Sequence, residues 1–284
     1  MGARTDLIPP DLLPAVTQEC GPIEHVEDRS WDHGEAQVLH VSGRSGTCFV
    51  KRHRTVDHHR REVRAYEHWV AGWADVPRFL GSTPDPLAIA VSELPGISPL
   101  SAAMPELAEV HRQAGAFSAR LHDLPVHDDD IALRDAVAQR TDAWLVRAVG
   151  MVEPATIDRV RAAIDEVLPL LDGWRRRACH RDFTERNWLW DGERLAVFDF
   201  GLSRLDLALT DVERLWSSSW REHPELADAY WDGYGATPTS DEEAVLVAYG
   251  VLQALTTVVW SVDHADQAYE ENGRERLRWL LGSA

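Results

Sequence analysis

Residues 180–201 read HRDFTERNWLWDGERLAVFDFG, and this stretch decides how the rest of the chain is interpreted. Asp182 is followed five residues later by Asn187, and Asp199 begins an Asp-Phe-Gly triplet. The apolar runs on either side of Asp191-Gly192 predict a hairpin of two short strands. The loop residues and Asp199 would then lie at the ends of one hairpin, so that groups distant in sequence become close in space.

These three polar side chains are the groups that transfer of a phosphoryl group requires. Their order and spacing match a kinase catalytic loop followed by its metal-binding turn. Asp182 would accept the proton of an acceptor hydroxyl, and Asn187 and Asp199 offer the hard oxygen ligands that Mg²⁺ prefers beside substrate phosphates. A solvated turn and a hairpin exit would explain each motif singly, but they explain the combined register poorly.

Lys51 is the single lysine among 29 basic residues, the other 28 being arginine. It ends the strand-like run 47–51, where a lysine that pairs with nucleotide phosphates would lie. Eleven residues on, Glu62 begins a segment with apolar residues at helical spacing and is the expected ion-pair partner, with Glu67 as the second candidate. The alternative is an ordinary edge-strand lysine and a solvated helix acid.

Upstream, residues 23–31 and 36–41 read as strands joined by a turn that contains Gly34. A glycine-bearing turn at this position would cover a nucleotide, although Gly34 is equally compatible with an ordinary hairpin. The chain has neither a Gly-x-Gly-x-x-Gly nor a Gly-x4-Gly-Lys-Ser/Thr motif, so neither a dinucleotide fingerprint nor a P-loop is supported.

Together, Lys51, Glu62, His180-x-Asp182-x4-Asn187 and Asp199 resemble the aminoglycoside phosphotransferase and choline kinase-like superfamily, small-molecule relatives of the protein kinases. The resemblance covers nearly the whole chain. Residues 107–124 resemble the helix before the catalytic insertions, and residues 93–96 resemble the connector between lobes, where adenine or guanine meets the backbone.

This resemblance implies an α+β, protein-kinase-like fold with an N-terminal antiparallel sheet and a helix, followed by a larger, mostly helical lobe. It implies Asp182 as the catalytic base and Asn187 and Asp199 as magnesium ligands, with ATP or GTP as co-substrate. The implied nucleotide site consists of Lys51, Glu62, Gly34, Glu93 and Leu94.

The catalytic loop departs from the family pattern. Small-molecule kinases usually carry His-Gly-Asp, whereas this chain has Arg181 before Asp182, as protein kinases do. Protein kinases place a lysine two residues after the catalytic aspartate, where this chain has Thr184, and they carry a later Ala-Pro-Glu that is missing here. A protein substrate is therefore not expected. Arg186 would contact phosphate in place of that lysine, or pair with Glu185 or another surface acid.

The pattern is strand-like before residue 96 and helical after it, as in a helix expected to begin near Pro154. We therefore expect a nucleotide-binding lobe over residues 1–95 and a catalytic and acceptor-binding lobe over residues 96–284. The chain's 44% apolar content and 12 tryptophans are sufficient for substantial cores. The polar residues 127–130 predict a loop.

No leader sequence is recognised, and the longest strongly apolar stretch, residues 248–260, is too short to span a bilayer. We therefore expect a cytoplasmic protein without a membrane partner. The three cysteines have no metal or redox spacing. His53, His58 and His59 are interpreted as solvated helix and loop residues rather than a metal patch.

The net charge of −18 argues against a nucleic-acid partner and favours a cationic one. Residues 211–284 hold 14 acidic residues against 5 arginines, which gives −9 in the final quarter of the chain. This asymmetry predicts acidic contacts to an acceptor, with Trp216, Trp220, Trp231 and Trp260 as walls, although each residue singly reads as a solvated acid or a core tryptophan. The acidic candidates are Asp211, Glu213, Asp232, Asp263, Asp266, Glu270 and Glu271.

The sequence thus predicts a magnesium-dependent kinase that phosphorylates a hydroxyl of a cationic small molecule, an aminoglycoside or related antibiotic, and so confers resistance. Within the same class, a kinase of choline, an amino sugar or a basic peptide antibiotic remains open, because the motifs fix the chemistry and not the acceptor. A nucleotide-binding pseudokinase is the alternative from another class.

Overall fold

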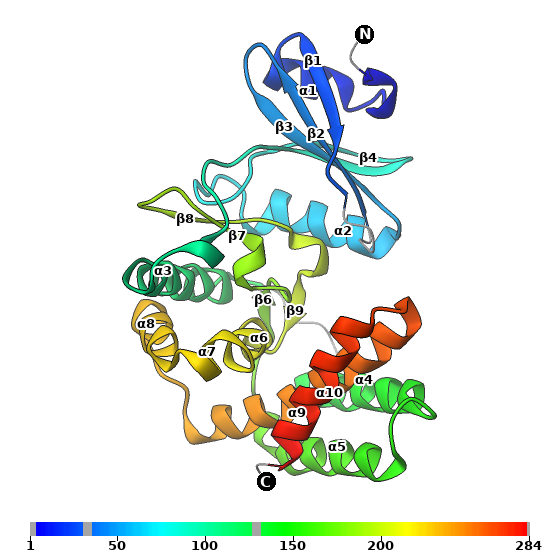
Figure 1. Ribbon diagram of the computed structural model, residues 1–284, viewed down its shortest axis with the longest axis vertical. Helices are drawn as coiled ribbons and strands as arrows, with labels where there is room; N and C mark the ends of the chain where they lie inside the picture. The colour runs from blue at the N-terminus through cyan, green and yellow to red at the C-terminus, as the bar shows by residue number, and fades with distance from the viewer. Residues whose placement is uncertain (1–3, 31–35, 127–131, 283–284) are drawn as a thin grey trace. The chain divides into compact units, whose positions relative to one another are not determined.

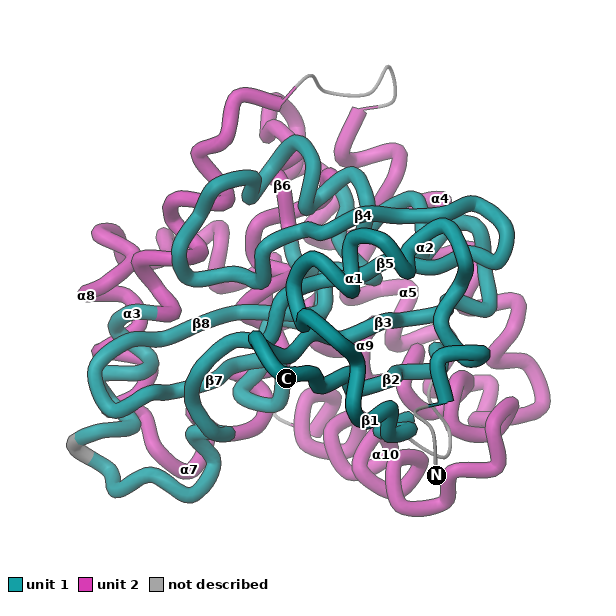
Figure 2. Tube along the Cα trace, turned by 90° about the horizontal axis from the view of Figure 1, so that it is seen from above, with its two compact units in different colours: residues 1–113, 180–204 teal, residues 114–179, 205–284 magenta. Residues whose placement is uncertain are grey.

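The structure is a computed structural model that describes residues 4–30, 36–126 and 132–282 (Figure 1). Its contacts define two compact units: residues 1–113 and 180–204 form unit 1, and residues 114–179 and 205–284 form unit 2 (Figure 2). The lobes expected from sequence divide the chain once, near residue 95. Each compact unit instead consists of two segments of the chain, because residues 180–204 pack with the first part of the chain. The division into two functional lobes stays a prediction.

Unit 1 contains a five-stranded antiparallel sheet with the strand order β1-β2-β3-β5-β4. The strands expected at 23–31 and 36–41 are present as β1 and β2, but Gly34 and its turn lie outside the described residues, as does the loop expected at 127–130. The strand bounds are β1 Ile23–Asp28, β2 Ala36–Gly43, β3 Thr47–His53, β4 Phe79–Pro84 and β5 Leu87–Ser92.

Alternation along β3 assigns its side chains to two faces of the sheet. Cys48 and Val50 face helix α1 (Leu13–Cys20) in an apolar core, whereas Lys51 points to the opposite face. The Sγ atoms of Cys20 and Cys48 lie 3.3 Å apart in this core as free thiols. Two cysteines that look scattered in the sequence are therefore neighbours, because α1 covers the start of β3.

Helix α2 (Val56–Arg64) carries Glu62 and follows β3 directly. The Thr55 side chain caps its N-terminus by accepting from the His58 amide, and its C-terminus continues into a π-helical turn, Ala65–Trp69. Glu62, Ala65 and Tyr66 are buried, whereas the second candidate partner, Glu67, is exposed. The helix thus turns Glu62 inward and Glu67 toward solvent.

The predicted hairpin is confirmed as β7 (Trp188–Trp190) paired antiparallel with β8 (Leu195–Val197). Its turn holds four residues rather than two, because the Asp191 carboxylate accepts from the amides of Glu193 and Arg194 and closes a wider loop. A 3₁₀ turn, Glu185–Asn187, precedes the hairpin, and Ile97 exchanges backbone hydrogen bonds with Trp190. These bonds attach the hairpin to the end of the connector at residues 93–96.

The helix predicted over 107–124 is α3 (Met104–His122), which carries the chain from unit 1 into unit 2. Unit 2 is mostly helical, and its longest helix is α9 (Ser240–His264), which packs against α4, α5 and α10. The remaining bounds are α4 Leu133–Ala148, α5 Pro154–Val167, α6 Glu213–Trp216, α7 Ser219–Glu222, α8 Pro224–Tyr234, α10 Gln267–Gly282, β6 Arg177–Cys179 and β9 Arg204–Asp206.

Helix α9 corrects one expectation, since it is 25 residues long and its most apolar 18-residue window has a mean hydropathy of 1.8, which by length and composition would suffice to cross a membrane. The apolar stretch at residues 248–260 alone is too short to span a bilayer, but the helix that contains it is longer. However, 72% of its most apolar window is buried inside the protein. Such burial is the property of a core helix, which is apolar all round because other helices surround it.

We predict that Gly96→Ala destabilises the protein more than Gly192→Ala. Both glycines have positive φ, but a Cβ at Gly96 would lie 2.8 Å from the Trp190 carbonyl, whereas one at Gly192 would meet nothing within 4 Å. Gly192→Ala should therefore lower the free energy of unfolding by about 1 kcal/mol, and Gly96→Ala by about 1–3 kcal/mol more. Urea denaturation measures both, and equal losses would contradict the close contact.

Candidate active site

The centre of the candidate site is the Lys51 ammonium on β3. Its Nζ lies 2.9 Å from Glu62 Oε2 and donates a hydrogen bond of 2.6 Å to Asp199 Oδ1. The predicted pair of Lys51 and Glu62 is therefore present. Glu62 is buried and Lys51 nearly so, and three segments of the chain meet at this one cation.

The charges of this cluster stabilise one another. Burial alone would lower the pKa of Lys51, but Asp199 and Glu62 outweigh it and raise that pKa above its ordinary value. Burial would likewise raise the pKa of the Asp199 carboxyl, but Lys51 outweighs it and holds that pKa well below its usual range. Lys51 thus stays protonated and Asp199 ionised at neutral pH.

Asp199 is positioned by an unusual backbone conformation at the end of the hairpin. It has φ 66° and ψ 70°, in the left-handed region, and its Oδ1 accepts from the Gly201 amide at 3.4 Å. The amide of Phe198, one residue earlier, donates to the Asn187 carbonyl. This backbone bond places Asn187 and Asp199 at adjacent ends of the hairpin, as the sequence predicted.

His180 fixes the catalytic loop from behind. Its Nε2 donates to the Phe198 carbonyl at 2.9 Å, and its Nδ1 accepts from the Asp182 amide at 3.3 Å. One nitrogen donates and the other accepts, so the two hydrogen bonds fix the orientation of the ring. The imidazole also packs 4.7 Å from the ring of Phe200, centroid to centroid. His180 therefore joins the loop that carries Asp182 to the segment that carries Asp199.

Asp182 is buried, and neighbouring donors hold its carboxylate. Asn187 Nδ2 donates to the Asp182 carbonyl at 2.8 Å and to Oδ2 at 2.9 Å. With its amide nitrogen so engaged, Asn187 keeps Oδ1 as an oxygen ligand. Arg186 Nη2 contacts both carboxylate oxygens of Asp182, at 2.7 and 2.6 Å. Glu185, the other acid considered for Arg186, lies instead 3.5 Å from His111 Nε2.

The donor set and the space around it fit a magnesium ion and phosphate groups. Asn187 Oδ1 and the Asp199 carboxylate are hard oxygen ligands. Gly201 lies beside the cluster, and a Cβ there would approach Asp199 Oδ1, Glu62 Oε2 and Lys51 Nζ at 3.3, 3.4 and 3.5 Å. A glycine at this position keeps open the space directly over the three charges.

Sequence reasoning missed His53, which it interpreted as solvated. His53 is buried at the end of β3, and its Nε2 lies 3.1 Å from Glu62 Oε2. The two-residue period of a strand places it on the same face as Lys51, and this signal would have identified it. His59, another residue of that group, has its Nε2 3.2 Å from the Ala88 carbonyl, and burial lowers its pKa.

The predicted connector residues lie in unit 1 and follow β5. Glu93 follows β5, its amide donates to the Thr47 carbonyl at 3.4 Å, and its carboxylate lies 3.2 Å from His40 Nε2. Leu94 follows in the same irregular segment. Their contact with a nucleotide base stays a prediction.

The acidic candidates from the last quarter of the chain belong to unit 2, and most already have partners there. Asp211 and Glu213 are buried, the first against His122 at 3.1 Å and the second in an ion pair with Arg276. These contacts give both residues a structural role, and acceptor contact by any of the seven stays a prediction. Asp263, Glu270 and Glu271 pair with Arg147, Arg274 and Arg278, Asp266 accepts from the Tyr269 amide, and Asp232 is exposed.

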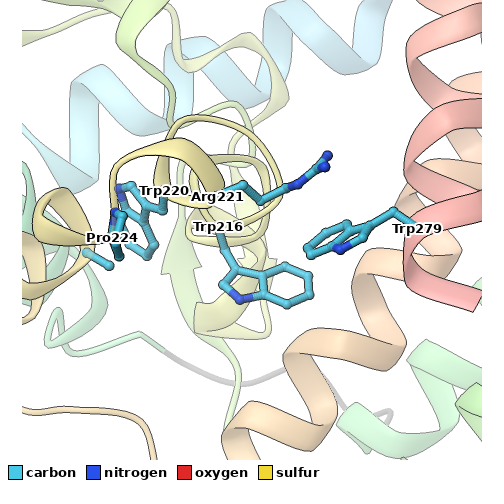
Figure 3. A pocket seen from close by; sticks show the side chains of 6 residues that line it. Trp216, Trp220, Arg221, Pro224 and Trp279 are labelled. Atoms are coloured by element: carbon cyan, nitrogen blue, oxygen red, sulfur yellow. The ribbon is translucent and has the colours of Figure 1, made fainter. Parts of the chain in front are cut away.

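The tryptophans expected as acceptor walls divide between two places in unit 2. Trp216 and Trp220 line a pocket of about 550 Å³ with Arg221 and Trp279 (Figure 3). The guanidinium of Arg221 already lies 4.3 Å above the Trp279 ring, where a ligand cation would stack. Trp231 packs against Trp220 and Tyr230, and Trp260 stacks on His264.

Among the described residues, one group has metal-ligand proximity: His122, Cys179 and Asp211 in unit 2. Sequence spacing did not reveal it because β6 brings Cys179 to the other two residues. His122 Nε2 and Asp211 Oδ2 already face each other at 3.1 Å, and the Cys179 thiol is directed to backbone carbonyls, as at Leu207. The group is therefore explained by its internal hydrogen bonds.

A sequence model described as the phosphotransferase enzyme family (APH) matches residues 28–246, which include every residue of the Lys51 and Asp182 clusters. The chain belongs to this family. The match confirms the resemblance read from the motifs. No curated protein sequence matches the chain significantly.

Solved structures confirm the kinase-like fold of this phosphotransferase. A thermostable mutant of aminoglycoside phosphotransferase APH(4)-Ia, in a ternary complex with ADP and hygromycin B, has a TM-score of 0.75 and 14% identity over 94% of this chain and 97% of that one. The GDP and kanamycin complex of APH(2")-IIia has a TM-score of 0.72 and 12% identity, covering 96% and 99%. A choline/ethanolamine kinase family protein from Mesorhizobium loti has a TM-score of 0.69 and 20% identity, covering 90% and 87%.

We predict that Lys51→Met lowers the free energy of unfolding by about 3 kcal/mol, because it leaves Glu62 buried without its cation. Replacing Glu62 as well, in Lys51→Met with Glu62→Leu, should restore part of this loss. As a control, Arg44→Met removes the partner of Glu24 from an exposed pair and should change stability by less than about 1 kcal/mol. Chemical denaturation compares the variants, and similar losses for Lys51 and Arg44 would argue against a buried pair.

We also predict that Asp199 makes stability depend on pH on the acid side. Its pKa is lower in the folded than in the unfolded chain, so between about pH 5 and pH 2 the unfolded chain binds more protons and stability falls as the pH falls. The melting temperature of metal-free Asp199→Asn should therefore fall less steeply over this range than that of the wild type. Parallel slopes in thermal melts at constant ionic strength would refute this coupling.

Proposed function

We propose that the chain is a magnesium-dependent kinase that transfers the γ-phosphoryl group of ATP or GTP to a hydroxyl of a cationic small molecule. The observation that carries the proposal is the convergence in unit 1 of the Lys51, Glu62 and Asp199 cluster with the Asp182 and Asn187 pair. This set contains a phosphate-binding cation, two metal ligands and a base.

Each residue has a distinct part in the proposed reaction. Lys51, held by Glu62, would bind nucleotide phosphates, and Asn187 Oδ1 and Asp199 would hold magnesium. The magnesium ion, when bound, supplies positive charge to the phosphate oxygens. Asp182 would orient the acceptor hydroxyl and accept its proton while the oxygen attacks the γ-phosphorus and the nucleoside diphosphate leaves.

The net charge of −18 supports a cationic acceptor. Two structures of similar fold contain the aminoglycosides hygromycin B and kanamycin, which favours an antibiotic of this class. We infer that phosphorylation confers resistance in the cytoplasm, because the added negative charge weakens the attraction of a polycation to RNA phosphates. The similarity to a choline/ethanolamine kinase family protein favours a metabolite kinase as the second candidate.

The test is a gain of one phosphoryl unit in mass on a panel of aminoglycosides, basic peptide antibiotics, choline and amino sugars, with ATP or GTP and magnesium. We predict a gain on one class of cationic acceptor and a loss of turnover of about 10²–10⁴-fold in Asp182→Asn. The matched control is Asp191→Asn, which alters a carboxylate of the same hairpin that accepts from the amides of its own turn. Near-normal turnover in a folded Asp182→Asn protein would exclude Asp182 as the base.

A further inference from the structure

Arg186 occupies an unexpected place for a residue beside a catalytic base. A single nitrogen, Nη2, lies 2.7 Å from Oδ1 and 2.6 Å from Oδ2 of Asp182. Asn187 Nδ2 adds a third donor at Oδ2. Both carboxylate oxygens of the proposed base therefore already accept hydrogen bonds. Two of the three hydrogen bonds come from the guanidinium of Arg186.

This arrangement conflicts with proton transfer from an acceptor hydroxyl. Both Asp182 oxygens already accept from a donor, so an acceptor hydroxyl has to displace one of these donors before it can hydrogen-bond to the carboxylate. The Asp182 side chain is only 10% exposed, so the approach of a hydroxyl to its oxygens is narrow. For Asp182 to act as the base, the Arg186 guanidinium has to leave at least one of its oxygens.

The Arg186 side chain is able to leave, whereas Asp182 is fixed. Arg186 is 43% exposed and lies on a single 3₁₀ turn, and among the described residues its guanidinium makes no hydrogen bond other than those to Asp182. Asp182 is held at its backbone by His180 and Asn187. The pair would therefore open by movement of the arginine.

A nucleotide would provide the competing partner. Guanidinium groups form strong, charge-assisted hydrogen bonds to phosphate oxygens. Arg186 is adjacent to Asn187, whose carbonyl is bonded to the residue before Asp199. The terminal phosphate of a nucleotide that binds at Lys51 and Asp199 would then lie near this arginine.

We propose that Arg186 is a positioning residue with two partners: it holds Asp182 in the nucleotide-free chain, and it moves to the terminal phosphate when the nucleoside triphosphate binds. This inference rests on the proposed function and adds a coupling to it. Asp182 becomes available to the acceptor hydroxyl only when the phosphoryl donor is present. The site would thereby gain an available base only when the phosphoryl donor is bound.

The coupling is measurable as binding, without turnover. Binding of the nucleotide has to break the Arg186–Asp182 pair in the wild type, whereas Asp182→Asn weakens that pair beforehand. Asp182→Asn should therefore bind magnesium with a non-hydrolysable triphosphate analogue more tightly than the wild type, by about three- to tenfold. Arg186→Gln should bind it more weakly, and Arg186→Lys should retain part of the affinity because it keeps the charge.

The double variant separates this coupling from simple charge repulsion. Loss of the Asp182 charge would by itself strengthen the binding of a phosphate. Asp182→Asn is therefore also made in the Arg186→Gln background, where it should raise the nucleotide affinity less than it does in the wild type. Calorimetry measures the affinity of each variant in this double-mutant cycle for non-hydrolysable adenosine and guanosine triphosphate analogues and for the corresponding monophosphates. The monophosphates should show no coupling between positions 182 and 186. Arg78→Gln is the matched control, since one Arg78 nitrogen contacts both oxygens of Glu19 at 2.8 and 2.7 Å in the same geometry.

The outcomes distinguish this inference from the proposed function. Coupling between positions 182 and 186 for triphosphates and not for monophosphates supports the two-partner arginine. If folded variants, checked by circular dichroism, all bind the triphosphate but show additive effects, Arg186 only fixes Asp182 and the inference fails alone. If the wild type binds neither nucleotide, the proposed function fails, and the inference fails with it.

Discussion

The Lys51 ammonium is the interaction on which the candidate site depends. Without this cation, Glu62 from α2 and Asp199 from the hairpin end would be two anions near one another, and Glu62 would be a buried carboxylate that has lost its lysine. With it, strand, helix and hairpin converge at fixed distances. The apolar core on the other face of β3, where α1 covers Cys48 and Val50, fixes which face Lys51 occupies. Core packing and the charge cluster are therefore two consequences of one alternating strand.

Much of this site was predictable because its signals are local. A lone lysine on a strand, an acid on the following helix and apolar runs around Asp191-Gly192 each encode a short-range geometry. The structure contains these elements, although the strand continues two residues beyond Lys51. Side-chain partners across longer distances were not predictable. The pairing of Arg186 with Asp182 and the contact of Cys20 with Cys48 depend on distances that no periodicity specifies. The four-residue turn depends on hydrogen bonds of the Asp191 side chain, which the Asp-Gly pair alone does not reveal.

The acidic last quarter of the chain shows why net charge predicts a partner better than it predicts a site. Its carboxylates serve several local purposes, among them a buried ion pair at Arg276, a bond to His122 and helix-end contacts. Charges paired in this way still contribute to the field of the whole protein, because the acids outnumber the arginines. The attraction of a cation thus depends on the net charge of the protein. The net charge does not reveal which residues contact the cation, because it carries no information on where the charges lie.

The departures of the catalytic loop from the family pattern have a backbone component as well as a charge component. Arg181 stands where small-molecule kinases usually have glycine, and it has φ 71°, a left-handed conformation that glycine adopts freely. Asp199 shares this region with φ 66°. At about 1–2 kcal/mol for each such residue, these conformations persist only if neighbouring contacts hold them. His180 provides that restraint, because its two ring nitrogens bind the Asp182 amide and the Phe198 carbonyl, one residue beyond Arg181 and one residue before Asp199. The chain can therefore carry an arginine in a glycine conformation beside its proposed base because the imidazole between the two strained positions is itself fully bonded.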